Sequence, residues 1–137
     1  DVLSDAELSI ILAREIAHGT LRHARTMQSA ASIAGVIDAL LPLRPDLTAC
    51  AGSAGLKPME DKLDQEADRL SLYMLARAGL DPALAPRTLD KLAIAYPVNV
   101  TNGYTALHPW TSERASLMQA TLAEIRQKQA GKKPLVP

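Results

Sequence analysis

The sequence has 137 residues, a length that predicts a single domain with its own core. Apolar residues make up 47% of it and there is no Phe, which predicts an aliphatic and mainly helical core. Fifteen basic residues balance fifteen acidic ones, so the chain lacks the positive charge that binding to nucleic acid would require. The single cysteine, Cys50, excludes an internal disulfide.

The first predicted helix begins at Ser4, because Ser4 and Glu7 have the spacing of a capping box. Apolar residues then recur at spacings of three and four, which predicts a helix to about Met27. The helical pattern resumes over residues 33–41 and ends before Pro42. One bent helix and two separate helices both agree with this pattern.

Residues 43–56 are rich in Pro, Gly, Ser and Thr, a composition that predicts a loop. Pro58 is expected at the first position of the next helix, because proline is tolerated there and acidic residues follow it. Gly79 is expected to end this helix as its C-terminal cap.

Asp81, which a proline follows, predicts the start of a shorter helix that ends at about Ala95. Residues 96–110 are expected to be irregular, and their alternation allows a short edge strand as well as a turn at the Asn-Gly pair. The last helix is expected to begin after Thr111 or the serine that follows it, and to end at about Gln129.

The first predicted helix contains the segment Arg14-Glu15-Ile16-Ala17-His18. Side chains four residues apart project from the same face of a helix, so positions 14 and 18 can reach one ion. In the pattern His-Glu-x-x-His, the two histidines bind zinc and the glutamate polarises the attacking water. Here the glutamate and the second histidine are present, whereas position 14 holds arginine.

Three segments, in the same order along the chain, resemble the HtpX-like gluzincins, zinc metallopeptidases related to the CAAX prenyl proteases. Residues 3–24 are similar to the metal-binding helix of this family and the Arg-His-Ala step that follows it. Residues 65–70, together with 78–82, are similar to the segment that supplies the glutamate ligand, and 108–114 look like the closing His-Pro element. The similarity extends from about residue 3 to about residue 120.

The resemblance implies a mainly α fold, a helical zincin-like core of about five helices that lacks most of the N-terminal sheet of the family. The metallopeptidase-like helical domain would span residues 1–130, with a flexible tail at 131–137. The cofactor implied is zinc, the partner a polypeptide, and the location the bacterial cell envelope, with a role in protein quality control.

The resemblance also implies a role for each site residue. His18 and Glu66 would bind the metal, and Asp68 would orient the metal histidines. Glu15 would activate a water molecule, and His108 and Arg114 would flank the catalytic centre. Three of these residues also have an interpretation without a site role. His108 would then be an ordinary loop histidine, and Asp68 and Arg114 would be charged residues on exposed helix surfaces.

Arg14 stands where the family has its first zinc ligand. A guanidinium stays protonated and offers no lone pair, so it cannot bind a metal ion. We therefore expect zinc to bind weakly or not at all, and Arg14 to pair with Glu66 in its place. His23 lies five residues from His18, about 140° around a continuous helix, and is expected to face elsewhere.

Two functions follow from this reading. The chain is either a zinc metalloendopeptidase-like domain whose activity Arg14 weakens or abolishes, or a non-catalytic pseudopeptidase that binds unfolded or partner polypeptides as a chaperone or scaffold. The longest apolar run, residues 30–43, is shorter than the ~20 residues of a membrane span. The sequence leaves open whether a membrane anchor precedes Asp1.

Overall fold

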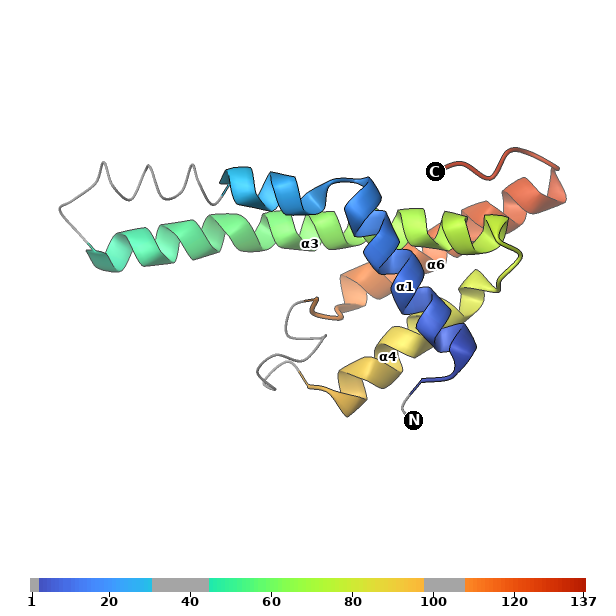
Figure 1. Ribbon diagram of the computed structural model, residues 1–137, viewed down its shortest axis with the longest axis horizontal. Helices are drawn as coiled ribbons and strands as arrows, with labels where there is room; N and C mark the ends of the chain where they lie inside the picture. Colours follow the sequence, from blue (N-terminus) through green and yellow to red (C-terminus); the bar gives the residue numbers. More distant parts are fainter. Residues whose placement is uncertain (1–2, 31–44, 98–107) are drawn as a thin grey trace.

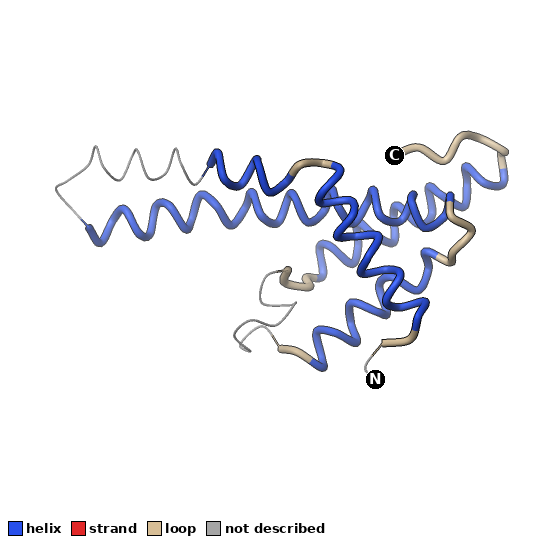
Figure 2. The backbone as a smooth tube through the Cα atoms, viewed as in Figure 1, coloured by secondary structure: helices blue, strands red, loops and turns tan. Residues whose placement is uncertain are grey.

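The computed structural model describes residues 3–30, 45–97 and 108–137. All regular secondary structure in these residues is helical, which confirms the predicted mainly α fold (Figure 2). The central element is the long helix α3, Pro45–Arg77, which packs against α1 and α6 (Figure 1). The predicted helix at residues 33–41 and the possible strand at residues 98–104 lie outside the described residues.

Helix α1, Asp5–Thr20, begins at the predicted capping box. The Ser4 hydroxyl accepts from the Glu7 amide at 3.4 Å, and the Glu7 carboxylate accepts from the Ser4 amide at 2.7 Å. The predicted end at Met27 is wrong, because Arg22 takes a positive φ of 58° and a new helical segment begins at His23. The chain therefore changes direction at Leu21 and Arg22, and this change decides where His23 lies.

Helix α3 begins at Pro45, so the prediction of a loop over residues 43–56 is wrong where the chain is described, from residue 45 onward. Pro45, rather than Pro58, takes the first helical position, where a missing amide hydrogen costs no hydrogen bond. Helix propensity is a weak guide for a single segment, and here the Gly and Ser residues do not interrupt the helix.

The far end of α3 follows the prediction. Gly79 has a φ of 75°, the left-handed conformation in which glycine carries no steric penalty. The amide of Leu80 donates to the carbonyl of Leu75 at 3.0 Å, and that of Gly79 to Ala76 at 3.3 Å. This pair of bonds is the Schellman arrangement, which satisfies the last carbonyls of the helix.

A short 3-10 helix and two further α-helices follow α3. Asp81 caps the short 3-10 helix η1, Pro82–Leu84, and α4, Ala85–Ala95, follows directly. The Thr111 hydroxyl accepts from the Arg114 amide at 3.2 Å and caps α6, Ser112–Ala130. After α6, Leu135 packs against the core, and the Val136 carbonyl accepts from Lys128 at 2.6 Å. The flexibility expected for the tail stays a prediction.

The core is aliphatic, as the composition predicts, apart from the buried ring of Tyr73. It joins one face of α1 to α3, α4 and α6 through Ile10, Ala13, Leu72, Tyr73, Leu75, Ala85, Leu89, Leu92, Met118, Leu122 and Ile125. In the part of the chain that the structure describes, no helix combines the length and apolar character needed to cross a membrane.

Candidate active site

Arg14 lies in the interior of the molecule, with 1% of its surface exposed. Its Nη2 donates to Asp64 Oδ1 at 2.6 Å and its Nε to Asp68 Oδ1 at 2.6 Å. Both aspartates are buried and lie on α3, one helical turn apart. The guanidinium thus connects α1 to α3 with short hydrogen bonds between opposite charges, the strongest type in proteins.

Arg114 approaches the same two aspartates from α6. Its Nε donates to Asp68 Oδ2 at 2.8 Å and its Nη2 to Asp68 Oδ1 at 2.9 Å, while Nη1 lies 3.2 Å from Asp64 Oδ2. Nη1 also donates to the carbonyl oxygen of Pro109 at 2.7 Å. Arg114 therefore connects α6 to α3 and holds the backbone that carries His108. We call Arg14, Asp64, Asp68 and Arg114 the ionic cluster.

The expected pair between Arg14 and Glu66 does not form. The Glu66 side chain is 47% exposed, and its Oε2 lies 3.4 Å from His23 Nε2. Residues two apart on a helix differ by about 200° in direction, so Glu66 faces away from the side of α3 that carries Asp64 and Asp68. A metal role for Glu66 stays a prediction, but the carboxylate that the fold brings beside Arg14 and His18 belongs to Asp64.

Asp64 is not among the site residues that the sequence alone indicates. The available signal was its spacing of four residues from Asp68, which places both carboxylates on one face of a helix. Asp68 was expected to orient the metal histidines. The contacts that place it in the site are hydrogen bonds from Arg14 and Arg114.

His18, Asp64 and His108 each place one possible ligand atom within 4.8 Å of the other two. His108 Nδ1 lies 2.8 Å from Asp64 Oδ1, and His18 Nε2 lies 3.3 Å from the same oxygen. The His18 Nε2 atom is buried, and within the described residues no hydrogen bond to it has suitable geometry. Two imidazoles and one carboxylate are donor types that zinc accepts.

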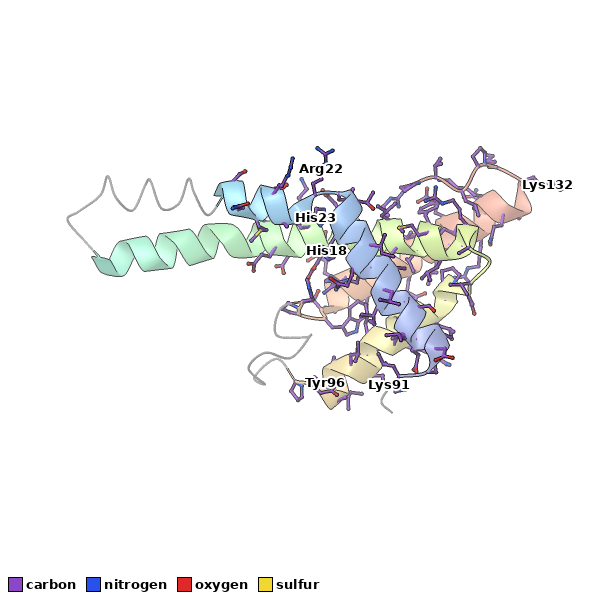
Figure 3. All side chains as sticks on the ribbon, viewed as in Figure 1. His18, Arg22, His23, Lys91, Tyr96 and Lys132 are labelled. Atoms are coloured by element: carbon purple, nitrogen blue, oxygen red, sulfur yellow. The ribbon has the colours of Figure 1, made fainter. Side chains whose placement is uncertain are left out.

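His23 also lies at the site, so the expectation that it faces elsewhere is wrong. Its Nδ1 is 2.9 Å from His18 Nδ1, and one of these two nitrogens must carry the hydrogen between them. The expectation assumed a continuous helix, whereas the turn at Arg22 brings His23 back over His18 (Figure 3). Burial, followed by the nearby charge on His18 when protonated, lowers the pKa of His23.

The environment of Asp64 favours its charged form. Burial disfavours a carboxylate, but the contacts from His108 and His18 and the charges of Arg14 and Arg114 outweigh burial. The pKa of Asp64 is therefore held well below its usual range. The ionic cluster then contains two positive guanidinium groups and two aspartate side chains, of which Asp64 is firmly ionised.

A cleft of about 770 Å³ opens beside the cluster. Its walls include Glu15, His18, His23, Glu60, Asp64 and His108. The Glu15 side chain is 48% exposed, with Oε1 4.0 Å from Arg14 Nη1. Of the residues to which the sequence assigned catalytic or metal roles, Glu15, His18 and His108 thus line one cleft, Asp68 and Arg114 lie buried beside it, and Glu66 lies outside the group.

The fold is helical, and its cleft carries Glu15 and His18 on α1 opposite the carboxylate of Asp64 on α3. The family model for peptidase family M48 matches residues 1–122, and the chain belongs to this family. No solved structure matches the chain.

Proteins similar to this chain include two kinds of peptidase. The mitochondrial metalloendopeptidase OMA1 of Arabidopsis thaliana is 29% identical over 94% of this chain and 28% of its own length. The beta-barrel assembly-enhancing protease of Yersinia pestis is 34% identical over 66% of this chain and 22% of its own length. That of Escherichia coli K12 is 28% identical over 65% and 21%. The chain therefore spans less than a third of the length of these relatives.

Proposed function

We propose that this chain is an M48 metallopeptidase-type domain whose peptide-bond hydrolysis is lost or strongly weakened. The observation that carries the proposal is the contact of Arg14 with Asp64 at 2.6 Å. Zinc-dependent hydrolysis needs three protein ligands and an open position for water. At this site the positively charged guanidinium of Arg14 donates a hydrogen bond to Asp64 Oδ1, the carboxylate oxygen that a metal ion would need.

The remaining donors do not fit zinc while Arg14 stays in place. Asp64 Oδ1 already accepts from Arg14 and contacts His108, and Asp64 Oδ2 lies 3.2 Å from Arg114. Arg14 and Arg114 already place two positive charges against Asp64 and Asp68, so a divalent ion would add positive charge beside two buried guanidinium groups. Glu15 would then lack a metal-bound water to polarise.

An assay of hydrolysis tests this proposal. The chain is incubated with an unfolded protein such as casein and with added zinc, beside the variant Glu15→Gln as the matched control. We expect the two proteins to give the same background rate, because the carboxylate of Glu15 has no activated water to act on. Zinc-dependent cleavage that Glu15→Gln abolishes would contradict the proposal.

A second candidate function is the binding of unfolded or partner polypeptides without cleavage, as a chaperone or scaffold. It is favoured by the cleft of about 770 Å³ and by an exposed apolar stripe on α1, formed by Leu8, Leu12 and Ile16 at spacings of four residues. Fluorescence anisotropy with a labelled unfolded polypeptide would measure such binding. The candidate predicts binding that Leu12→Asp weakens and that Ile94→Asp, an exposed apolar residue on α4, leaves unchanged.

We also propose a location in the cell envelope, which the resemblance implies. It is supported by bacterial relatives that are named for beta-barrel assembly. Fractionation of the source cells with an antibody against this chain tests the location. Recovery of the protein in the cytoplasmic fraction alone would exclude it.

A further inference from the structure

One carboxylate oxygen, Asp64 Oδ1, is the point at which donors from three parts of the chain meet. Arg14 Nη2 reaches it at 2.6 Å from α1, and His108 Nδ1 at 2.8 Å from the segment before α6. His18 Nε2 lies 3.3 Å from it, without a well-aligned hydrogen bond. Of these three groups, only the two imidazoles can give a lone pair to a metal ion.

His18, Asp64 and His108 are already close enough to bind one ion together, since their nearest ligand atoms lie within 4.8 Å of one another. Zinc lies about 2 Å from nitrogen and oxygen ligands, so a trio at this separation needs only small side-chain shifts. The trio does not use position 14 as a ligand. Arginine at that position therefore does not by itself remove the third ligand from this group.

The charge of Arg14 is a separate obstacle. An ion about 2 Å from Asp64 Oδ1 would lie beside the buried guanidinium that contacts the same oxygen. Arg14 is 1% exposed and is held by Asp68 as well, so it cannot turn toward solvent without leaving a second carboxylate buried and short of a partner.

We infer that Arg14 is a built-in cation that occupies a latent metal site formed by His18, Asp64 and His108, and so excludes divalent metal ions from it. This inference rests on the proposed loss of zinc-dependent hydrolysis and gives it a specific cause. If the only effect of Arg14 were its failure to supply a ligand atom, a neutral residue without ligand atoms at position 14 would leave metal binding as weak as before. If Arg14 blocks the site, the same neutral residue creates metal binding.

The test compares Arg14→Leu with Arg14→Lys and the unchanged chain by calorimetric titration with zinc. Leucine removes the charge and adds no ligand, whereas lysine keeps a positive charge at the position. We expect Arg14→Leu to bind one zinc per chain at least about tenfold more tightly than the other two proteins. The double variant Arg14→Leu/His108→Asn is expected to lose that gain. Equal and weak zinc binding by all of these proteins would overturn the inference.

Arg14→Leu takes a partner from two buried carboxylates, so its folding is measured in the same series by circular dichroism. If it is unfolded without zinc, the inference predicts that zinc restores the helical signal and that it does not do so in the double variant. Failure of zinc to restore the fold, with Arg14→Lys folded, would overturn it. The proposed function fails on a different result, zinc-dependent cleavage by the unchanged chain, so the two failures are distinguishable.

Discussion

The buried ionic cluster and the partly exposed ion pair between Arg69 and Glu124 use the same chemical groups in different surroundings. Arg14 and Arg114 are 1% and 2% exposed, whereas the side chains of Arg69 and Glu124 are 42% and 32% exposed. Both sites have short contacts, 2.6 Å from Arg14 to Asp64 and 2.8 Å from Arg69 to Glu124. Distance alone therefore does not decide what an ion pair contributes to stability.

We expect the two ion pairs to contribute differently to stability because one is buried and the other is partly exposed. At the surface, water solvates either partner when the other is removed, so the loss is small. Inside the protein, removal of one partner leaves the other charge without water and without a counter-charge. We therefore expect the ionic cluster to be far more sensitive to substitution than the pair on the outer face of α3 and α6.

The largest expected effect is that of Asp68→Asn. The asparagine has nearly the same shape but no charge, so Arg14 and Arg114 would share only the carboxylate of Asp64. We expect the free energy of unfolding to fall by about 3–5 kcal/mol, as measured by urea denaturation. The matched control is Asp5→Asn in the exposed first turn of α1, for which we expect a small change. Equal effects of the two substitutions would refute the contrast between buried and exposed charges.

A smaller effect is expected for Arg114→Lys, which keeps the charge. A lysine ammonium cannot span both oxygens of Asp68 and also reach the Pro109 carbonyl, as the guanidinium does. We expect a loss of about 1–3 kcal/mol in unfolding free energy, the cost of leaving buried acceptors unsatisfied. Arg126→Lys on the same helix, where the arginine is exposed, serves as the control. If the two variants have the same stability, the geometry of the cluster is unimportant.

Acid is expected to weaken the cluster only at low pH. Burial opposes ionisation of Asp64, but its contacts with His108, His18 and the two arginines hold its pKa in the folded state below the ordinary value. A carboxylate with a lowered pKa contributes stability that is present above its unfolded pKa of about 3.9 and is lost as the pH falls through the folded pKa. The unfolding free energy, measured from pH 7 down to pH 2, should show this loss below about pH 4. In Asp64→Asn the corresponding part of the pH dependence should disappear, and an unchanged profile would contradict the assignment.

The smallest effect is expected for Arg69→Gln, which removes the partly exposed ion pair with Glu124. Solvent screens both groups, so we expect a change below about 1 kcal/mol that vanishes at high salt. Urea denaturation at low and at molar sodium chloride measures it. A loss as large as that of Asp68→Asn would show that burial does not govern these pairs.

Much of the fold could be predicted from the sequence, because caps and breakers act locally. The capping box at Ser4, the left-handed Gly79 and the start signals at Asp81 and Thr111 all lie where the sequence placed them. The start of α3 could not be predicted in this way, since the composition of residues 45–56 is typical of a loop although they are helical.

The candidate site was predictable only in part. The resemblance identified the helix with Glu15 and His18 and the segment with His108, which the fold brings to one cleft. It did not identify Asp64 as the partner of Arg14, because that choice depends on which face of α3 turns toward α1. The position of His23 depends on the positive φ of Arg22. Residues other than glycine rarely adopt this conformation, so the sequence gives no sign of it.

If the guanidinium of Arg14 takes the place of a metal ion between α1 and α3, the purified protein contains little zinc. The chain is produced in zinc-supplemented cells, purified without chelators and analysed by plasma mass spectrometry. We expect a zinc content far below one ion per chain. A content close to one ion per chain, lost in a His18→Asn variant that remains folded, would contradict it.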